Sequence, residues 1–237
     1  LILEGCSVGG QIIFTEKVDN YPGFPEGIGS YELIQRMQRQ AENSGVEITY
    51  EEARQITVDE KTQEKTIFTP NKKFTSRTVI IATGAAPKKM DIPGEKEFTG
   101  RGVSYCAICD GPLYKGKDVV VIGGGDKAIE EALFLSRLAN KVTVIHRRTT
   151  LRASKVLKEQ AEKEKNINFI LECLPEEIKG TDSVESVRIR NVKTQKTDII
   201  PTSGVFIFVG IVPNTEFVRD FLTLDEKGFI ITDEAMN

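Results

Sequence analysis

Two cysteines three positions apart are the residues of this chain best suited to redox chemistry. Cys106 and Cys109 have the C-x-x-C spacing that serves both zinc sites and redox-active dithiols. A structural zinc site needs four ligands, and the other candidate ligands are singletons without a second C-x-x-C or H-x-x-H: Cys6, Cys173 and His146. The spacing therefore favours a redox dithiol, and we expect no metal site.

An acidic residue, Asp110, directly follows the cysteine pair. An ordinary thiol has a pKa of about 8.5 and is only a few per cent thiolate at neutral pH, so a redox pair benefits from a neighbour that moves protons. A carboxyl beside the pair can protonate a departing thiolate or accept a proton from the attacking thiol. The alternative is that Asp110 is a turn residue before Gly111 and Pro112. The sequence leaves both interpretations open.

A glycine-rich turn at residues 123–128 reads G-x-G-x-x-A, between an expected strand at 117–122 and an expected helix at 126–139. Glycines there let the backbone approach a pyrophosphate, and the unpaired N–H groups of the helix N-terminus favour an anion. A second strand expected at 142–145 completes a βαβ dinucleotide-binding pattern. The residues expected to contact the nucleotide are Gly123, Gly125, Asp126, Lys127 and Ala128.

Basic residues follow the second strand of this unit. A site for NAD usually has Asp or Glu about 20 residues after the turn, where it binds the ribose hydroxyls. Here His146 is followed by Arg147 and Arg148, with Arg152 a turn later. Guanidinium groups bind phosphate in a bidentate manner, so the cluster favours NADPH over NADH. The alternative is a solvated basic face, and we expect His146 to shape the site rather than to act as a catalyst.

The elements around these motifs alternate between strands and helices. Residues 1–3 and 78–82 are apolar runs typical of strands, and 78–82 leads into a turn at 83–87. Residues 31–44 predict a helix that ends at Gly45. Further short strands are expected at 48–50, 55–59, 66–69, 168–172, 184–192, 197–200 and 205–209, and a charged helix at 154–165. Linkers at 88–94 and 210–214 enclose an insert that contains the βαβ pattern.

The composition indicates a soluble globular protein of 237 residues, with 39% hydrophobic and 28% charged residues. The net charge is −3 and the basic residues are scattered apart from those at 146–148, so we expect no nucleic-acid binding. The longest apolar runs are far shorter than the roughly 20 residues of a membrane helix. No secretory leader opens the chain, and we therefore expect no membrane association and a cytoplasmic location.

The order and spacing of these motifs resemble those of the bacterial-type, low-molecular-weight thioredoxin reductases. The resemblance rests on C-A-x-C-D-G at 106–111, the glycine turn with Glu130 and Glu131 after it, and the H-R-R segment with Arg152. Segments similar to the family's FAD-contacting and hinge segments lie at 4–11, 20–23, 82–85, 210 and 213–214. The resemblance covers nearly the whole chain.

This resemblance implies an α/β fold with two dinucleotide-binding, Rossmann-like three-layer domains of the pyridine nucleotide-disulfide oxidoreductase type. Residues 1–88 and 213–237 would form a discontinuous FAD-binding domain, and residues 89–212 an NADPH-binding domain that carries the redox disulfide. The residues implied to bind FAD are Glu4, Gly5, Gly9, Gly10, Gln11, Asn20, Thr83, Gly84 and Ala85. Those implied to bind NADPH are the turn residues above together with Arg147, Arg148 and Arg152.

The resemblance also implies an electron path and partners. Hydride would pass from NADPH to FAD, and electrons then to the disulfide, with Cys109 facing the flavin, Cys106 attacking thioredoxin and Asp110 as the acid/base. Because NADPH and the disulfide share a domain, they would take turns at the flavin by rotation about the hinge. The resemblance further implies a homodimer.

The chain departs from the family pattern at its ends and in the nucleotide turn. The family's opening strand with its G-x-G-x-x-G turn would precede Leu1, and its closing Gly-Asp segment would follow Asn237, so we expect an incomplete FAD domain. Lys127 stands where Ser or Thr is usual, and Leu151 where Phe is common. Two alternatives share this core: the flavoprotein subunit of alkyl hydroperoxide reductase, and an inactive NADPH-binding fragment.

Overall fold

The computed structural model describes residues 1–5, 7–15 and 17–234. Cys6, one of the two isolated cysteines, lies outside the described residues. Cys173, the other, is a free and buried thiol. Within the described ranges, no helix has both the length and the apolar character needed to cross a membrane.

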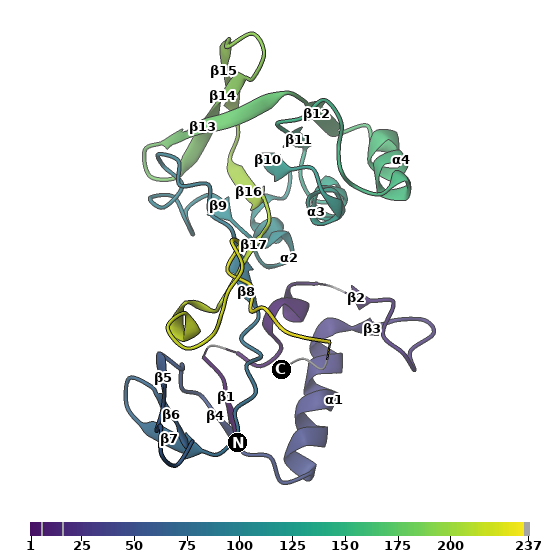
Figure 1. Cartoon of the computed structure of the whole chain (residues 1–237). Coiled ribbons are helices and arrows are strands. Elements are labelled where there is room, and N and C mark those ends of the chain that lie inside the picture. The colour runs from purple at the N-terminus through teal and green to yellow at the C-terminus, as the bar shows by residue number, and fades with distance from the viewer. Residues whose placement is uncertain (6, 16, 235–237) are drawn as a thin grey trace. The chain divides into compact units, whose positions relative to one another are not determined.

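The chain divides into two units, each with its own packed interior. The first unit comprises Leu1–Ala86 and Val212–Asn237, and the second comprises Pro87–Ile211 (Figure 1). Two connecting strands pair with each other: β8 (Ala85–Pro87) and β17 (Ile211–Pro213). A backbone bond from Lys88 N to Gly210 O, 2.9 Å long, continues this pairing. The second connection lies within the linker expected at 210–214, whereas the first lies in the expected turn at 83–87, just before the linker expected at 88–94. The cofactor that each unit binds stays a prediction.

A five-stranded parallel sheet forms the centre of the second unit, with strand order β12-β11-β10-β16-β9. In that order the strands are Ile167–Ile170, Lys141–Ile145, Asp118–Gly123, Gly204–Phe208 and Val103–Ser104. Helix α3 (Asp126–Ser136) connects β10 to β11, which confirms the expected βαβ pattern. Because β10 and β11 are parallel neighbours, the glycine turn after β10 and the basic segment after β11 lie at the same edge of the sheet.

The side chains of β10 alternate between two interiors. Val119 and Val121 belong to the apolar cluster that includes residues of α3 and of α4 (Lys155–Lys163). Val120 and Ile122 belong to the cluster on the opposite face, which the antiparallel sheet covers. All four side chains are at most 3% exposed, and burial of each contributes about 1.5–3 kcal/mol. The second unit therefore has three layers, with the parallel sheet in the middle.

The antiparallel layer contains one strand that the sequence did not indicate. Its strands are β13 (Cys173–Gly180), β14 (Val184–Asn191) and β15 (Thr197–Pro201). The last two were expected, but β13 was not. Its pairing with β14 shifts register between Pro175 and Glu177 and again after Lys179. These irregularities break the alternation of apolar and polar residues by which a half-buried strand is recognised.

The first unit is built from short elements around one long helix, α1 (Ser30–Asn43), which confirms the helix expected before Gly45. A parallel pair joins β1 to β4, an antiparallel pair joins β2 to β3, and β5, β6 and β7 form an antiparallel sheet. These strands are Ile2–Leu3, Ile48–Thr49, Lys17–Val18, Ile28–Gly29, Gln55–Val58, Lys65–Phe68 and Lys73–Ser76. The 3-10 turns η1 (Gly10–Phe14) and η3 (Glu216–Val218) complete the unit.

The prediction of a strand at 78–82 is wrong, because the structure has no strand there. Val79 and Ile81 pack into the interior that contains Ile56 and Val218, whereas Ile80 is 92% exposed. The side chains thus alternate as in a strand, but no described segment pairs with this backbone. An apolar run predicts an extended backbone, whereas a strand also requires a hydrogen-bonded neighbour.

Candidate active site

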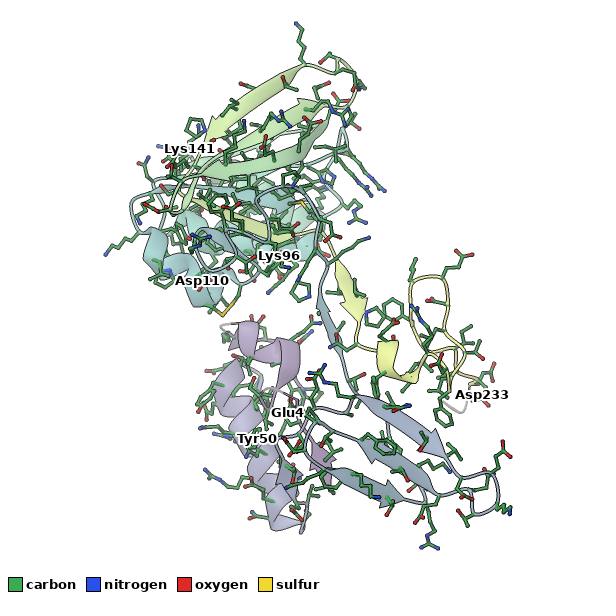
Figure 2. All side chains as sticks on the ribbon, turned by 90° about the vertical axis from the view of Figure 1, so that its left-hand side faces the viewer. Glu4, Tyr50, Lys96, Asp110, Lys141 and Asp233 are labelled. Carbon is green, nitrogen blue, oxygen red and sulfur yellow. A yellow bond between two sulfur atoms is a disulfide. The ribbon has the colours of Figure 1, made fainter. Side chains whose placement is uncertain are left out.

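The cysteine pair forms a disulfide on a single helical turn of the second unit. Cys106 precedes α2 (Ala107–Asp110), and its Cα atom lies 5.4 Å from that of Cys109. Figure 2 shows the disulfide beside Asp110. The Cys109 amide donates a hydrogen bond of 3.1 Å to the Cys106 sulfur. Because an N–H donor stabilises a thiolate, the geometry favours negative charge on Cys106 when the pair is reduced.

Ser104, at the end of β9, fixes the approach to the disulfide. Its hydroxyl accepts a bond of 3.0 Å from the Cys106 amide and donates one of 3.1 Å to the Cys106 carbonyl. The side chain is buried, at 4% exposure. Sequence reasoning missed this residue because a serine two positions before a cysteine carries no recognisable signal.

Small residues let α2 lie directly on α3. Ala107 is fully buried and belongs to the same cluster as Ala128, Ile129 and Ala132 of α3. A side chain at Gly111 would press against Phe134 and Leu135, since an added Cβ atom would lie 3.1–3.2 Å from them. The dithiol is therefore carried on a rigid element that rests on the helix of the nucleotide turn.

Asp110 closes α2 and lies half-buried beside Cys109. Its amide donates a bond of 3.2 Å to the Cys106 carbonyl. Burial raises the pKa of Tyr114, and the negative charge of Asp110 raises it further, so the carboxylate acts electrostatically on its surroundings. The acid/base role of Asp110 stays a prediction, since a residue that ends a helical turn has the same placement.

The glycine turn after β10 has the shape that a dinucleotide requires. Added side chains would overlap the Phe208 carbonyl at Gly123 and the His146 ring at Gly124. At Gly125, in contrast, nothing lies within 4 Å of an added Cβ atom. Gly125 is also the residue before α3, so no side chain caps the first amides of the helix. The turn thus fits a pyrophosphate: it is closed where the backbone packs and open where an anion would lie.

Asp126 ties this turn to the segment that carries Arg152. Its Oδ1 atom accepts a bond of 2.7 Å from the Ser154 amide. The Gly124 carbonyl accepts bonds of 2.6 Å from the Arg152 amide and 3.1 Å from the Ala153 amide. The structure therefore gives Asp126 a positioning contact within the turn, and its contact with a nucleotide stays a prediction.

The predicted arginines gather near this turn. Arg147, Arg148 and Arg152 are exposed, whereas His146 is only 6% exposed. Burial lowers the pKa of His146, and the charges of the three arginines, Arg152 most strongly, lower it further. The Nε2 atom of this buried ring has no hydrogen-bond partner among the described residues. A neutral histidine packed on the turn, with guanidinium groups facing solvent, fits the binding of a phosphorylated nucleotide.

In the first unit, hydrogen bonds bring four of the predicted FAD residues together. Gln11 Nε2 donates a bond of 2.8 Å to the Ala85 carbonyl. The Thr83 hydroxyl donates one of 2.7 Å to the Asn214 carbonyl, and Asn214 Nδ2 returns one of 3.0 Å to the Thr83 carbonyl. The backbone amide of Asn214 also donates a hydrogen bond of 2.9 Å to the Gly84 carbonyl. Asn214 is thus a central residue here; the sequence placed it in a linker and in a segment similar to the family's FAD-contacting and hinge segments, but not among the residues expected to bind FAD.

The remaining predicted FAD residues have separate surroundings. Gly9 packs against Ile13 and Ile34, while Gly10 is open on its Cβ side. Glu4 continues the pairing of β1 with β4 through its amide, and Asn20 lies exposed between β2 and β3. Gly5 lies against the side chain of Glu52. The open backbone at Gly10 and Gly84, both with positive φ, leaves room for a ligand as a flavin site requires.

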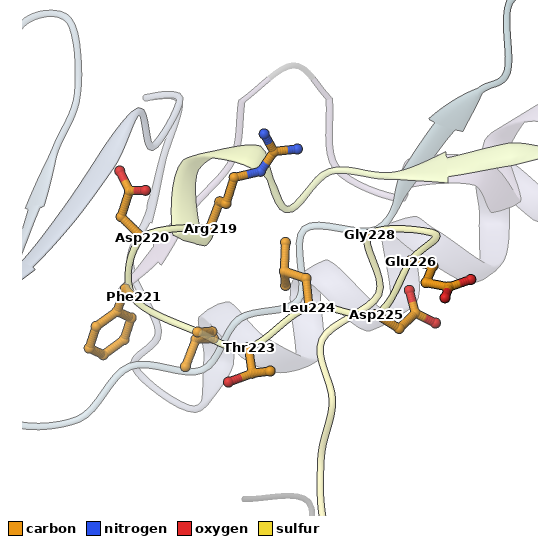
Figure 3. A pocket seen from close by; sticks show the side chains of 9 residues that line it. Arg219, Asp220, Phe221, Thr223, Leu224, Asp225, Glu226 and Gly228 are labelled. Carbon is orange, nitrogen blue, oxygen red and sulfur yellow. The ribbon is translucent and has the colours of Figure 1, made fainter.

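A cavity in the first unit is separate from these residues. Its volume is about 580 Å³, and the loop 219–228 lines it (Figure 3). Most of the side chains shown are polar or acidic, and none of the predicted cofactor-binding residues is among them. This loop is therefore not the candidate site.

Comparison with known proteins identifies the family. The model of the pyridine nucleotide-disulphide oxidoreductases matches residues 1–237. Thioredoxin reductase of Peptoclostridium litorale is 44% identical over all of this chain and 76% of its own length, and that of Treponema pallidum is 43% identical with the same coverage. The crystal structure of Lactococcus lactis thioredoxin reductase is 45% identical over 99% of this chain and 77% of its own, with a TM-score of 0.93. This chain therefore belongs to the pyridine nucleotide-disulphide oxidoreductases and, within them, to the thioredoxin reductases.

Proposed function

We propose that this chain transfers electrons from NADPH, through FAD and the Cys106–Cys109 pair, to the disulfide of an oxidised thioredoxin. The observation that carries the proposal is the disulfide on α2, which packs on the same helix that begins at the nucleotide turn. The relatives to which the chain is similar are named thioredoxin reductases, which supports thioredoxin as the substrate. When bound, NADPH would supply a hydride, and FAD would accept it and pass the electron pair on to the disulfide.

The nucleotide is assigned to the second unit, proposed as residues 89–212. The turn at 123–128 would hold the pyrophosphate, because its backbone is open at Gly125 and the first amides of α3 are free of a capping side chain. Arg147, Arg148 and Arg152 would bind the 2′-phosphate. His146 would remain uncharged and hold the turn in shape.

The flavin is assigned to the first unit, proposed as residues 1–88 and 213–237. Gln11 and residues 83–85 would contact it, since their mutual hydrogen bonds and those of Asn214 fix one backbone surface. The other residues proposed to contribute are Glu4, Gly5, Gly9, Gly10 and Asn20.

The dithiol chemistry is assigned to three residues. The Cys106 thiolate attacks the thioredoxin disulfide, which forms a mixed disulfide and releases one thioredoxin thiol. Cys109 then attacks Cys106, which restores the Cys106–Cys109 disulfide and releases the second thiol. The bond from the Cys109 amide to the Cys106 sulfur supports Cys106 as the nucleophile. Asp110 would supply and accept the proton.

The proposal extends to assembly and location. We infer a homodimer in the cytoplasm that acts on thioredoxin and binds neither nucleic acid nor membrane. No observation on the described residues favours the alkyl hydroperoxide reductase alternative, and the relatives compared above are all thioredoxin reductases.

The first test is the visible absorption spectrum of the purified protein before and after anaerobic addition of NADPH, followed by assay with thioredoxin. A flavin band that NADPH bleaches is expected. In Cys106→Ser we expect bleaching to persist and thioredoxin reduction to be lost, whereas Cys173→Ala, which removes a buried cysteine outside the pair, should retain turnover. Thioredoxin reduction by the Cys106→Ser variant would contradict the assignment.

A further inference from the structure

An ion pair on α3 joins a residue of the nucleotide turn, Lys127, to a buried carboxylate, Glu131, that has no part in the function proposed above. Lys127 Nζ contacts Glu131 Oε1, one helical turn along. The Glu131 side chain is only 4% exposed, whereas that of Lys127 is 49% exposed. The other carboxylate oxygen, Oε2, has no hydrogen-bond partner among the described residues. Burial of a carboxylate costs free energy of folding unless the carboxylate is paired. Here the ion pair involves only the Oε1 atom.

The Glu131 carboxylate faces the element that carries the dithiol. Burial raises the pKa of Glu131, while Lys127 and then the backbone amide of Ala107 lower it. Ala107 directly follows Cys106 and is fully buried against α3. The carboxylate is therefore next to the backbone that joins the two cysteines, on the side away from solvent.

The charged groups around this carboxylate come from both packed elements. On α3, Lys127 is the neutralising partner and Glu130 adds negative charge. On α2, the Ala107 amide approaches it, and Asp110 and the cysteines belong to the same helical turn. Lys127 reaches the carboxylate from its half-exposed side chain, whereas the Ala107 backbone approaches the same carboxylate from the buried element that carries the dithiol.

We propose that Glu131 is a positioning residue of the Cys106–Cys109 pair, and that its ion pair with Lys127 sets how much negative charge lies behind the pair when it is reduced. The redox role of the cysteines rests on the function proposed above. Negative charge near a thiol disfavours the thiolate, and the ammonium of Lys127 offsets part of that effect. Lys127, in the first turn of α3, thereby couples the nucleotide turn to the acidity of the dithiol.

The test is the pH profile of thiol alkylation, measured without nucleotide. The purified protein is reduced with dithiothreitol, freed of it anaerobically and treated with iodoacetamide at a series of pH values. Peptide mass spectrometry separates Cys106 and Cys109 from the other cysteines. In Glu131→Gln the midpoint for Cys106 should fall by about one pH unit, the shift that a nearby charge typically produces. Glu131→Asp, which keeps the charge, should move back toward the parent profile.

A matched pair on another helix supplies the control. Lys155 and Glu159 are also four residues apart, on α4, but are exposed. Glu159→Gln should leave the profile unchanged. Coinciding midpoints for Glu131→Gln and the parent protein would overturn the proposal, as would an equal shift in Glu159→Gln.

A second variant keeps the proposal testable if Glu131→Gln does not fold. Lys127→Gln removes the ammonium and leaves the carboxylate, so the Cys106 midpoint should rise, opposite to the change in Glu131→Gln. A midpoint that is unchanged or lower would refute the role of the pair. Because no NADPH or thioredoxin takes part, these results are independent of the reductase assay. Failure of that assay alone would remove the proposed function and leave the charge effect in place.

Discussion

At the scale of single residues, Arg147 and Arg148 decide between the two nicotinamide nucleotides. Both side chains are exposed after β11, at the edge of the sheet where the glycine turn also lies. Replacement of both by Gln removes charge-assisted hydrogen bonds that only a 2′-phosphate can use. We expect the KM for NADPH to rise about tenfold or more and the KM for NADH to change little, as steady-state kinetics with each nucleotide would measure.

The control for this prediction is Lys155→Gln, which removes an exposed cation at the start of α4. It should alter neither constant. An equal rise in the KM for both nucleotides in the double arginine variant would place the 2′-phosphate contact elsewhere.

Single residues also differ in whether their roles can be predicted from the sequence. Arg147 and Arg148 were predictable because they follow a strand whose role is recognisable from its glycine turn. Lys127 was predicted as a nucleotide contact and noted as a departure from the family pattern, but not as the partner of a buried carboxylate. Its ion pair with Glu131 spans four positions of one helix, a local spacing. The approach of the Ala107 amide to the Glu131 carboxylate instead depends on the packing of α2 against α3, whose residues lie about 20 positions apart in the sequence. No local pattern encodes such a contact.

At the scale of elements, a buried carboxylate ties the linker to the dithiol segment. Glu95 is 2% exposed and accepts two bonds of 3.0 Å from the Met90 amide, while its Oε1 atom accepts one of 2.7 Å from the Tyr105 hydroxyl. Tyr105 immediately precedes Cys106. Tyr105→Phe should lower the free energy of unfolding by about 1–2 kcal/mol, because a hydrogen bond to a charged group is lost. Urea denaturation of both proteins measures this.

The pH dependence of stability checks that the Tyr105 hydroxyl is the cause. Burial and the neighbouring Glu95 raise the pKa of Tyr105 above its usual value of about 10. The unfolded phenol therefore loses its proton first, and stability should decline as pH rises above about 10. Tyr105→Phe should flatten this decline, whereas Tyr50→Phe, at an exposed tyrosine, should not. An equal slope in Tyr105→Phe and the parent protein would contradict the assignment.

Elements differ in how far the sequence predicts them. The unit β10–α3–β11 was predicted because the spacing of its apolar residues and its glycine turn both indicate a strand, a helix and a second strand. The four-residue helix α2 was not, since a single turn leaves no helical period to read. The strand expected at 78–82 was wrong because an apolar run carries no information about which backbone will pair with it. Register shifts hid β13 in the same way.

At the scale of the whole molecule, the two units have unequal interiors. The second contains two large apolar clusters on the faces of its parallel sheet. The first contains a small one, built from residues such as Ile56, Ile67 and Val218. Because the apolar area buried sets much of the stability of each unit, the two units should differ in stability and unfold locally as separate regions. A ligand that binds one unit should therefore stabilise that unit alone.

Hydrogen exchange with NADP⁺ tests which unit binds the nucleotide. A ligand that binds only the folded unit stabilises it by about 2.7 kcal/mol at a hundredfold excess over its Kd. We therefore expect slower exchange of amides in β10, α3 and β16, measured by mass spectrometry, while β5, β6 and β7 of the first unit exchange as before. The double arginine variant provides the control and should lose this protection at the same NADP⁺ concentration. Protection confined to the first unit would reverse the assignment of the nucleotide, because binding energy appears only where the contacts form.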